Sequence, residues 1–275
     1  MSRRQRVVTA AVLAPVAIGS VLLLPTHWLA AATALLLLAG LWEWTLLAGL
    51  TDRVPRATYL LANAAMMAAL AWSAGPVLFP LKLLSLIGVL WWLLALIWLW
   101  RSRFAAADSS GARMLKLLVG SLCVLPAWAA LIWLHAGSEH GARWALLALM
   151  LVWAADSGAY FAGMRFGRHK LAPTISPGKS WEGVWGGAAA TLLLAALAWP
   201  LLGLELDAVP ALLLLTLVVT AISVAGDLFE SLMKRHSGIK DSGSVIPGHG
   251  GLMDRLDSLL AALPVFAVGK AWLGL

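Results

Sequence analysis

The chain has 275 residues, of which 61% are hydrophobic and 12% are charged, with a formal net charge of +7. Soluble domains carry about 25% charged residues, so a chain this apolar cannot cover a soluble surface and needs lipid as its solvent. The 16 Trp residues against 2 Tyr are typical of a membrane protein with interfacial anchors. The single cysteine, Cys123, excludes a disulfide framework or a cysteine metal cluster within one chain.

Apolar runs long enough to span a bilayer, which takes about 20 residues, recur along the chain. We predict an all-α, polytopic transmembrane bundle of about nine spans. These are Val7–Leu24, Trp28–Ala48, Thr58–Phe79, Leu83–Trp100, Leu115–Leu134, Trp144–Gly163, Val184–Leu202, Ala208–Phe229 and Leu256–Leu275. The last is the weakest prediction, because Asp257 and Lys270 flank a short core that Pro264 interrupts.

The N-terminal segment carries three arginines before its apolar run, a pattern that signal peptides share. A second span follows at once, so we favour an uncleaved first helix. With the N-terminus in the cytoplasm, all but three of the 20 basic residues (Lys82, Arg143 and Lys270) fall on the cytoplasmic side. This asymmetry predicts the N-terminus inside and the C-terminus outside, and it explains the basic charge without a nucleic-acid partner.

Acidic residues in or beside spans are the first functional candidates, because an ionisable group in lipid is expensive. Four such acids are present: Glu43, Asp156, Glu182 and Asp227. Glu43, between two tryptophans, fits a lipid headgroup, a metal, a basic partner or a structural ion pair. Asp156 and Glu182 border the first long polar stretch, and Asp227 borders the second.

The first polar stretch, about Arg165–Gly183, follows the motif Asp156-Ser-Gly-Ala-Tyr160, in which the two named residues are one helical turn apart. It ends in Ser-Pro-Gly-Lys-Ser-Trp-Glu-Gly at residues 176–183. The Gly-Lys-Ser triplet is not a P-loop, because Pro173 stands where an earlier glycine is required and no strand–loop–helix context is predicted. A basic loop with glycine and serine can still hold a triphosphate.

The second polar stretch begins at the end of the eighth span. On a helix Asp227, Ser231 and Lys234 share one face. A carboxylate, a hydroxyl and an ammonium on one face, at the cytoplasmic end of a span, suit a metal–phosphate site. A capped helix end with snorkelling side chains is the alternative.

A glycine-rich loop over residues 240–251 follows, and Asp254, Arg255 and Asp257 open the last helix. Successive amides in such a loop can cradle phosphate, and the helix N-terminus adds its dipole. Carboxylates together with phosphate oxygens are what Mg²⁺ prefers. A simple turn before an Asp-capped helix is the alternative, but it leaves the cluster of charged residues between two apolar spans unexplained.

Residues 231–257 read Ser-Leu-Met-Lys-Arg-His-Ser-Gly-Ile-Lys-Asp-Ser-Gly-Ser-Val-Ile-Pro-Gly-His-Gly-Gly-Leu-Met-Asp-Arg-Leu-Asp. This run resembles the signature of the phosphatidate cytidylyltransferases, also called CDP-diacylglycerol synthases. The segments 156–160 and 176–183 resemble further motifs of that family. The N-terminal half resembles bacterial members mainly in its span pattern, together with Trp42-Glu43-Trp44.

The resemblance implies an enzyme of the bacterial inner membrane that joins CTP and phosphatidate to give CDP-diacylglycerol and pyrophosphate, with Mg²⁺. Its active site would face the cytoplasm. Residues 1–140 would supply N-terminal helices and residues 141–275 the catalytic region of one integrated membrane domain. Asp227 and Asp254 would be the main metal ligands, in a centre with room for a second cation. Small-residue helices are also compatible with a homodimer.

The residues expected to act on phosphates are mostly charged. The predicted catalytic residues are Asp227, Lys234, Arg235, Lys240, Asp241, His249, Asp254, Arg255 and Asp257. The predicted substrate-binding residues are Asp156, Ser157, Tyr160, Ser176, Lys179, Ser180, Glu182, Ser231, Gly250 and Gly251. The basic groups would neutralise the triphosphate and the lipid phosphate, while Asp241 and Asp257 would be second ligands or orient those groups.

Two other functions fit parts of the pattern. A CTP-dependent polyprenol or dolichol kinase would also use CTP, metal and basic residues, but it would transfer the γ-phosphate to an alcohol. A transporter would line a pathway with intramembrane acids. The gathering of polar residues at one face, rather than at the midplane, favours an enzyme.

Overall fold

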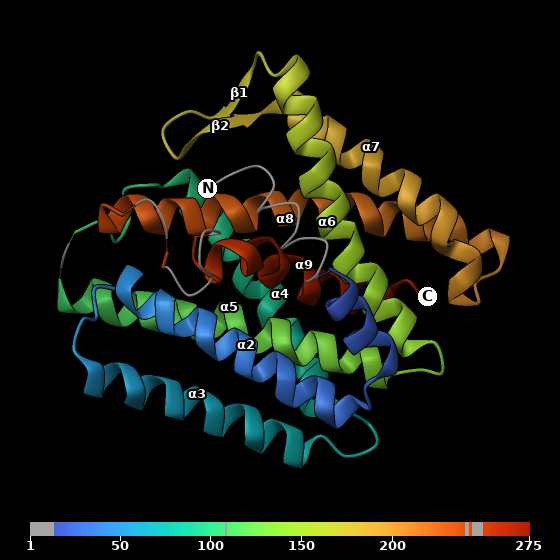
Figure 1. The fold of residues 1–275 in the computed structure, drawn as a ribbon, viewed down its shortest axis with the longest axis horizontal. Helices are drawn as coiled ribbons and strands as arrows, with labels where there is room; N and C mark the ends of the chain where they lie inside the picture. The colour runs from blue at the N-terminus through green and yellow to red at the C-terminus, as the bar shows by residue number, and fades with distance from the viewer. Residues whose placement is uncertain (1–13, 108, 240–241, 244–249) are drawn as a thin grey trace.

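The computed structural model describes residues 14–107, 109–239, 242–243 and 250–275. The long helices are α2 (Thr26–Leu47), α3 (Arg53–Ser73), α4 (Phe79–Trp100), α5 (Ser110–Ala136), α6 (Gly141–Phe166), α7 (Trp181–Ala198), α8 (Val209–Ser237) and α9 (Met253–Trp272) (Figure 1). A short helix over Ala14–Leu23 precedes them. Two 3₁₀ turns, η1 (Trp199–Leu202) and η2 (Leu206–Ala208), connect α7 to α8.

Six helices are long and apolar enough to cross a membrane within the part of the chain that the structure describes. They are Thr26–Leu47, Phe79–Trp100, Ser110–Ala136, Gly141–Phe166, Trp181–Leu202 and Leu206–Ser237. The protein is therefore a multi-pass membrane protein. The first predicted span falls partly outside the described residues, and the count of nine spans and the orientation of the N-terminus stay predictions.

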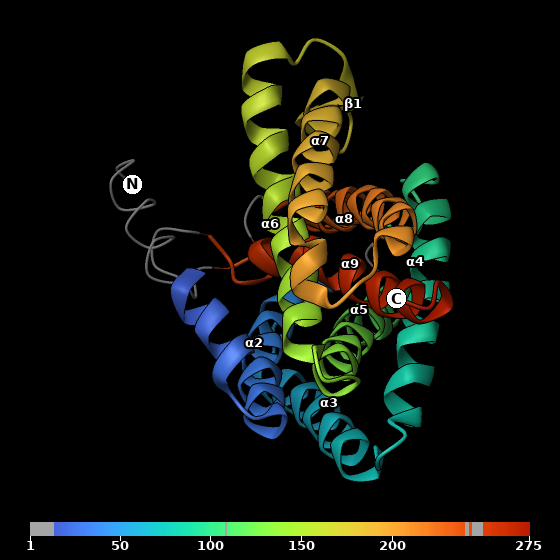
Figure 2. The same cartoon turned by 90° about the vertical axis from the view of Figure 1, so that its right-hand side faces the viewer.

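Helix α9 is central, although its sequence is the least apolar of the predicted spans near the C-terminus. It packs against α8, α5, α4, α6 and α2, and Figure 2 shows it in the middle of the bundle. Residues 256–264 are buried along its length. Asp257 and Ser258 in its first two turns are thus surrounded by protein, which is where charged groups at membrane depth are tolerated.

Helices α6 and α7 run side by side and project from the rest of the bundle (Figures 1 and 2). Small residues let their backbones meet. A Cβ placed on Gly158 would lie 2.8 Å from the Cβ of Ala190, and one on Gly187 would lie 2.9 Å from the Ala155 carbonyl oxygen. Close backbone approach at small residues is the usual way in which membrane helices associate.

A two-stranded hairpin at the projecting end of α6 and α7 is the exception to the all-α prediction. β1 (Lys170–Ala172) pairs antiparallel with β2 (Ser176–Ser180), and Ala172 lies opposite Ser176. The segment was predicted as a loop, because its Pro-Gly pair and short length carry no alternating apolar pattern.

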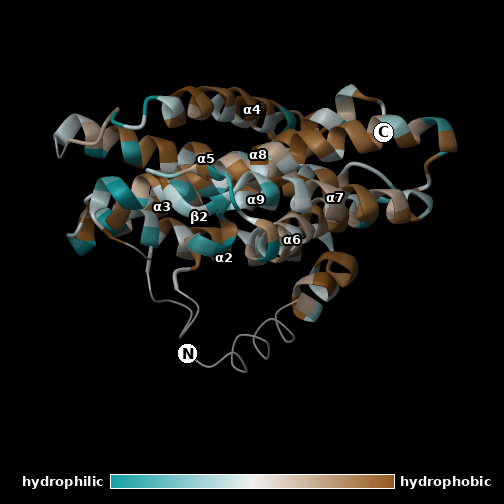
Figure 3. Ribbon diagram, turned by 90° about the horizontal axis from the view of Figure 1, so that it is seen from above, coloured by the Kyte–Doolittle hydropathy of each residue, from teal (hydrophilic) through white to brown (hydrophobic). Residues whose placement is uncertain are grey.

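An aromatic cluster fixes α8 against α2 and α4. The Phe229 ring stacks on Trp44 at 6.5 Å between centroids and meets Trp91, Trp92 and Trp98 edge-on at 5.6 to 5.9 Å. Such pairs contribute about 0.5–1.5 kcal/mol each beyond area burial. Apolar residues cover most of the long helices, whereas hydrophilic residues gather around β2 and the neighbouring helix ends (Figure 3).

Candidate active site

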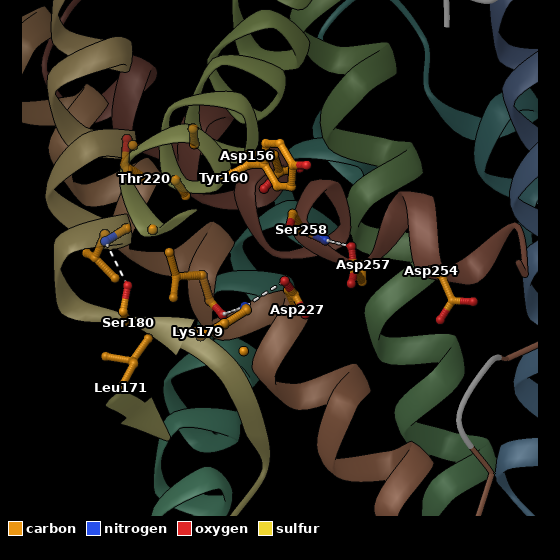
Figure 4. Close-up of a pocket in the computed structure, with 18 of the residues that line it drawn as sticks. Asp156, Tyr160, Leu171, Lys179, Ser180, Thr220, Asp227, Asp254, Asp257 and Ser258 are labelled. Carbon is orange, nitrogen blue, oxygen red and sulfur yellow. Dashed lines mark hydrogen bonds and ion pairs between the residues drawn. The ribbon is translucent and has the colours of Figure 1, made fainter. Parts of the chain in front are cut away.

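A cavity of about 420 Å³ lies among α6, α7, α8, α9 and the β1–β2 hairpin (Figure 4). Its charged lining residues come from four elements: Asp156, Lys179, Asp227, Lys234, Asp254, Arg255 and Asp257. All seven are predicted site residues, and Tyr160 and Ser180 line the cavity as well. Residues that lie up to about a hundred positions apart therefore meet around one volume.

On the α6–α7 side, the cavity is lined by polar side chains and by small residues. Asp156 and Tyr160 project from successive turns of α6, as their spacing predicts. Gly163 and Gly183 line the same wall and pack closely, since a Cβ on Gly163 would lie 3.8 Å from the Cα of Gly183. Ser180 is the N-cap of α7, because its hydroxyl oxygen accepts a hydrogen bond from the Gly183 amide at 3.2 Å.

Lys179 crosses from the hairpin to α8. Its ammonium group lies 2.6 Å from Oδ2 of Asp227 and also donates to the Val224 carbonyl at 3.4 Å. The other oxygen of Asp227 accepts from the Ser231 hydroxyl at 3.3 Å, so the predicted shared face of α8 is present. The pair of Lys179 and Asp227 thus links a strand of the hairpin to an acid on α8 across the cavity (Figure 4).

A second ion-pair network joins α8 to α9. The Lys234 ammonium donates to Glu230 at 2.7 Å and to Oδ1 of Asp254 at 2.5 Å. Oδ2 of Asp254 accepts from the backbone amides of Ser242 at 3.2 Å and Gly251 at 2.9 Å. Both oxygens of Asp254 are therefore engaged: Oδ1 links α9 to α8, and Oδ2 holds the segment that precedes α9.

Asp257 sits where α8 and α9 cross. Gly226 makes this crossing close, since a Cβ there would lie 2.6 Å from the Asp257 carbonyl oxygen. Its carboxylate accepts from the Ser258 amide at 2.6 Å and faces the cavity. Carboxylates from three helices, Asp156 of α6, Asp227 of α8 and Asp257 of α9, thus line the cavity.

The donor set fits a hard divalent cation that shares its ligands with a phosphate. Among the described residues no three His, Cys, Asp or Glu side chains are arranged to hold a metal by themselves. Mg²⁺ usually takes only one or two carboxylates and completes its octahedron with substrate phosphates and water. Asp227, Asp254 and Asp257 line a cavity with three basic groups, which is compatible with that mode.

Four predicted residues lie outside the cavity lining, three of them in or against the hairpin. Glu182 accepts from the amides of Arg168 and His169 and pairs with the His169 ring at 2.6 Å. Arg235 donates to the Ile175 carbonyl at 3.1 Å. Ser176 lies in the strand ladder, and Ser157 is exposed on α6. The contacts of Glu182, Arg235 and Ser176 are within the protein. The catalytic role of Arg235 and the substrate-binding roles of the other three residues stay predictions.

The remaining predicted residues belong to the segment before α9. Gly250 adopts a left-handed conformation, with φ of 78°, which glycine takes without steric cost. The Gly251 amide holds Asp254, as described above. Lys240, Asp241 and His249 lie outside the described residues.

Two hydroxyl-bearing cavity residues were not predicted from the sequence. Thr220 and Ser258 both line the cavity, and Thr220 shares a 2.9 Å hydrogen bond with Thr191 of α7. Thr220 stands seven residues before Asp227, which is two turns along the same helical face. The spacing of Thr220 could therefore have predicted its place beside Asp227 from the sequence. Ser258 has no such spacing, because it only follows Asp257 directly in the chain.

Comparisons with known proteins agree on one family. A sequence model of the cytidylyltransferase family matches residues 4–271. A Pseudomonas aeruginosa protein named phosphatidate cytidylyltransferase is 43% identical over 268 residues, which cover 96% of this chain and 95% of that protein. A Haemophilus influenzae protein of the same name is 38% identical over 96% of this chain and 97% of its own length. A Staphylococcus haemolyticus protein, also so named, is 35% identical over 75% of this chain and 76% of its own. The chain belongs to the cytidylyltransferase family.

Proposed function

We propose that the protein transfers CMP from CTP to phosphatidate, giving CDP-diacylglycerol and pyrophosphate. The observation that carries the proposal is the cavity in which Lys179, Lys234 and Arg255 face a group of carboxylates. Anionic phosphates need basic partners, and a shared metal needs acids, so the mixture suits two phosphate substrates. Relatives named phosphatidate cytidylyltransferase supply the substrate class.

The reaction needs positioning and charge neutralisation rather than a protein nucleophile. A phosphate oxygen of phosphatidate attacks the α-phosphorus of CTP, and the bond from that phosphorus to the oxygen of the β-phosphate breaks. Pyrophosphate leaves with the electron pair, and no covalent enzyme intermediate is required. Holding two such anions in line is the largest contribution that the chain can make.

The basic residues divide between two walls. Lys179 reaches in from β2, while Lys234 and Arg255 stand on α8 and α9. We assign Lys179 to the triphosphate, because it comes from the projecting hairpin, and the other two to charge that develops on the departing pyrophosphate and to the lipid phosphate. Ion pairing with phosphate requires Lys179 to exchange Asp227 for a substrate oxygen.

For Mg²⁺ we propose Asp227 and Asp254 as ligands, with Asp257 as a second acid beside them. When bound, the ion would neutralise the α-phosphate and the leaving group. Asp254 already accepts hydrogen bonds from Lys234 and from two backbone amides. Those donors hold the carboxylate in one orientation.

The location follows from the two substrates. CTP is water-soluble and phosphatidate lies in a leaflet, so they meet at a membrane surface. We propose the bacterial inner membrane with the cavity facing the cytoplasm, an uncleaved N-terminal helix that starts inside, and about nine spans. A homodimer is a further part of the proposal, on the basis of small-residue helix faces.

The test uses CTP labelled separately on the α- and γ-phosphates, with purified protein, Mg²⁺ and phosphatidate in detergent. We expect the α-label in the lipid phase, the γ-label in pyrophosphate, and no transfer after chelation of divalent metal. The same assay with polyprenol and dolichol is the control for specificity. Transfer of the γ-label into those alcohols, or no transfer of either label, would contradict the proposal.

A further inference from the structure

Glu43 is a buried carboxylate that lies next to the cavity in space, although it comes far before the cavity-lining residues in the sequence. It lies on α2 and is only 2% exposed. It is absent from the cavity lining. A carboxylate that is removed from water is costly unless hydrogen bonds replace the lost hydration, so its partners indicate what it is for.

Two of those partners belong to the segment that leads into α9. Oε2 of Glu43 accepts from the Met253 amide at 2.9 Å and from the Ser242 hydroxyl at 3.2 Å. Met253 is the first residue of α9, and the residue before it, Leu252, makes no side-chain cap. Glu43 therefore caps α9 from another helix. An acceptor with negative charge is favourable there, because the first amides of a helix are unpaired and carry the positive end of its dipole.

Two glycines enclose the same carboxylate. A Cβ on Gly251 would lie 2.6 Å from Oε2 of Glu43, and one on Gly243 would collide with its other oxygen. Any larger residue at either position would displace the acid or the chain. The two ends of the segment before α9 thus close around Glu43.

Asp254 holds the same segment from the cavity side. Its Oδ2 accepts from the Ser242 and Gly251 amides, while Glu43 takes the Ser242 hydroxyl. Ser242 is therefore fixed between two carboxylates, one in the core and one in the cavity. Because Asp254 and Asp257 follow Met253 on the first turns of α9, the position of that first turn decides where both acids reach the cavity.

We propose that Glu43 is a positioning residue for the transfer reaction: it fixes the first turn of α9, and with it the cavity acids, from the opposite side of the bundle. The inference rests on the proposed function. It distinguishes Glu43 from the metal or headgroup ligands that the sequence also allowed, because its carboxylate faces the backbone of α9 and not the cavity.

The test compares Glu43→Ala and Glu43→Gln with Thr45→Val. Thr45 is a matched control, since it is buried on the same helix and bonds to Arg56 of α3 rather than to α9. We expect kcat per folded protein to fall about 100-fold in Glu43→Ala, the size of loss from a roughly 1 Å misplacement. Glu43→Gln keeps an acceptor oxygen and should lose less. Thr45→Val should lower thermal stability and keep its kcat.

A readout apart from activity separates positioning from general stability. Hydrogen exchange of peptides over residues 250–256 should be about tenfold faster in Glu43→Ala, because one lost hydrogen bond is roughly 1.4 kcal/mol. The same peptides should exchange normally in Thr45→Val. If Glu43→Ala fails to fold, Glu43→Gln decides by the same two measurements.

Equal kcat and equal exchange in the Glu43 variants and the Thr45 control would overturn the proposal. Failure of the proposed function gives a different result, namely a wild-type protein that transfers no CMP. The exchange comparison would still show whether Glu43 holds the first turn of α9 in that case.

Discussion

The two walls of the cavity are held in opposite ways. On the α8–α9 side, Phe229 is enclosed by four tryptophans, and Glu43 and Asp254 fix the start of α9. On the α6–α7 side, two helices pack on each other through small residues, and the hairpin beyond them is held by a few polar contacts such as that of Arg235 with Ile175. One wall is built into the core and the other projects from it.

This difference suggests that the two walls have different roles in the reaction. Regions with few buried apolar contacts and exposed hydrogen bonds have lower local stability than core elements. The acids near the aromatic cluster therefore have fixed positions, which suits metal coordination. Lys179 comes from the less buried wall, which suits a group that must exchange Asp227 for a phosphate. Mutations on the two walls should therefore affect different measured quantities.

The largest effect is expected on the core wall. Asp227→Asn removes a charge and keeps the shape, so we expect kcat to fall about 10²- to 10³-fold, as when one group that stabilises developing charge is lost. Thermal stability should change little, because the residue is only partly buried. The assay is α-label transfer from CTP at saturating phosphatidate. Near-normal turnover would rule out a metal-binding role for Asp227.

Asp207→Asn is the matched control for that experiment. Asp207 is exposed in η2, outside the cavity lining. It should keep its wild-type turnover, so that a loss in both variants would indicate an effect of the mutations on the preparation rather than on the site.

The projecting wall should control CTP binding. Lys179→Met removes a charge-assisted contact of about 1.5–3 kcal/mol, so KM for CTP should rise about 10- to 100-fold, with Lys179→Arg in between. Lys170→Met is the control, because Lys170 is exposed on the same hairpin and outside the cavity lining. A fall in kcat with unchanged KM would instead place Lys179 with the fixed groups.

The sequence predicts the apolar helices well and the polar contacts poorly. The predicted span Leu83–Trp100 corresponds to α4, Phe79–Trp100. An uninterrupted apolar run in lipid has no other stable structure than a helix whose backbone hydrogen bonds are all internal. The hairpin was predicted as a loop, since Lys179 and its neighbours have no strand periodicity.

The site shows the same limit. The shared face of Asp227 and Ser231 was predictable because helical spacing is local. The partner of Glu43 was not, because Met253 lies 210 residues away and only the packing of α2 on α9 brings them together. The pairing of Lys179 with Asp227 likewise depends on tertiary structure.

Packing within the projecting wall can be tested by a glycine substitution. In Gly158→Leu the side chain would meet Ala190 and the backbone of Gly186, so we expect a loss of about 1–3 kcal/mol in unfolding free energy. The measurement is thermal unfolding in detergent. Gly111→Ala is the control, because a Cβ there meets nothing within 4 Å. Equal stability of the two variants would mean that α6 and α7 can separate without cost.

The smallest effect is expected at the base of the hairpin. Glu182 pairs with the His169 ring and two amides on the surface, and exposed pairs contribute little, so Glu182→Gln should lower kcat/KM for CTP by less than about threefold. Glu205→Gln, at an exposed residue before η2, gives the baseline. The sequence alone suggested that Glu182 binds substrate. A loss larger than that of Lys179→Met would restore that interpretation. A contact confined to the hairpin base acts on CTP only through Lys179, so its loss cannot exceed the effect of removing Lys179 itself.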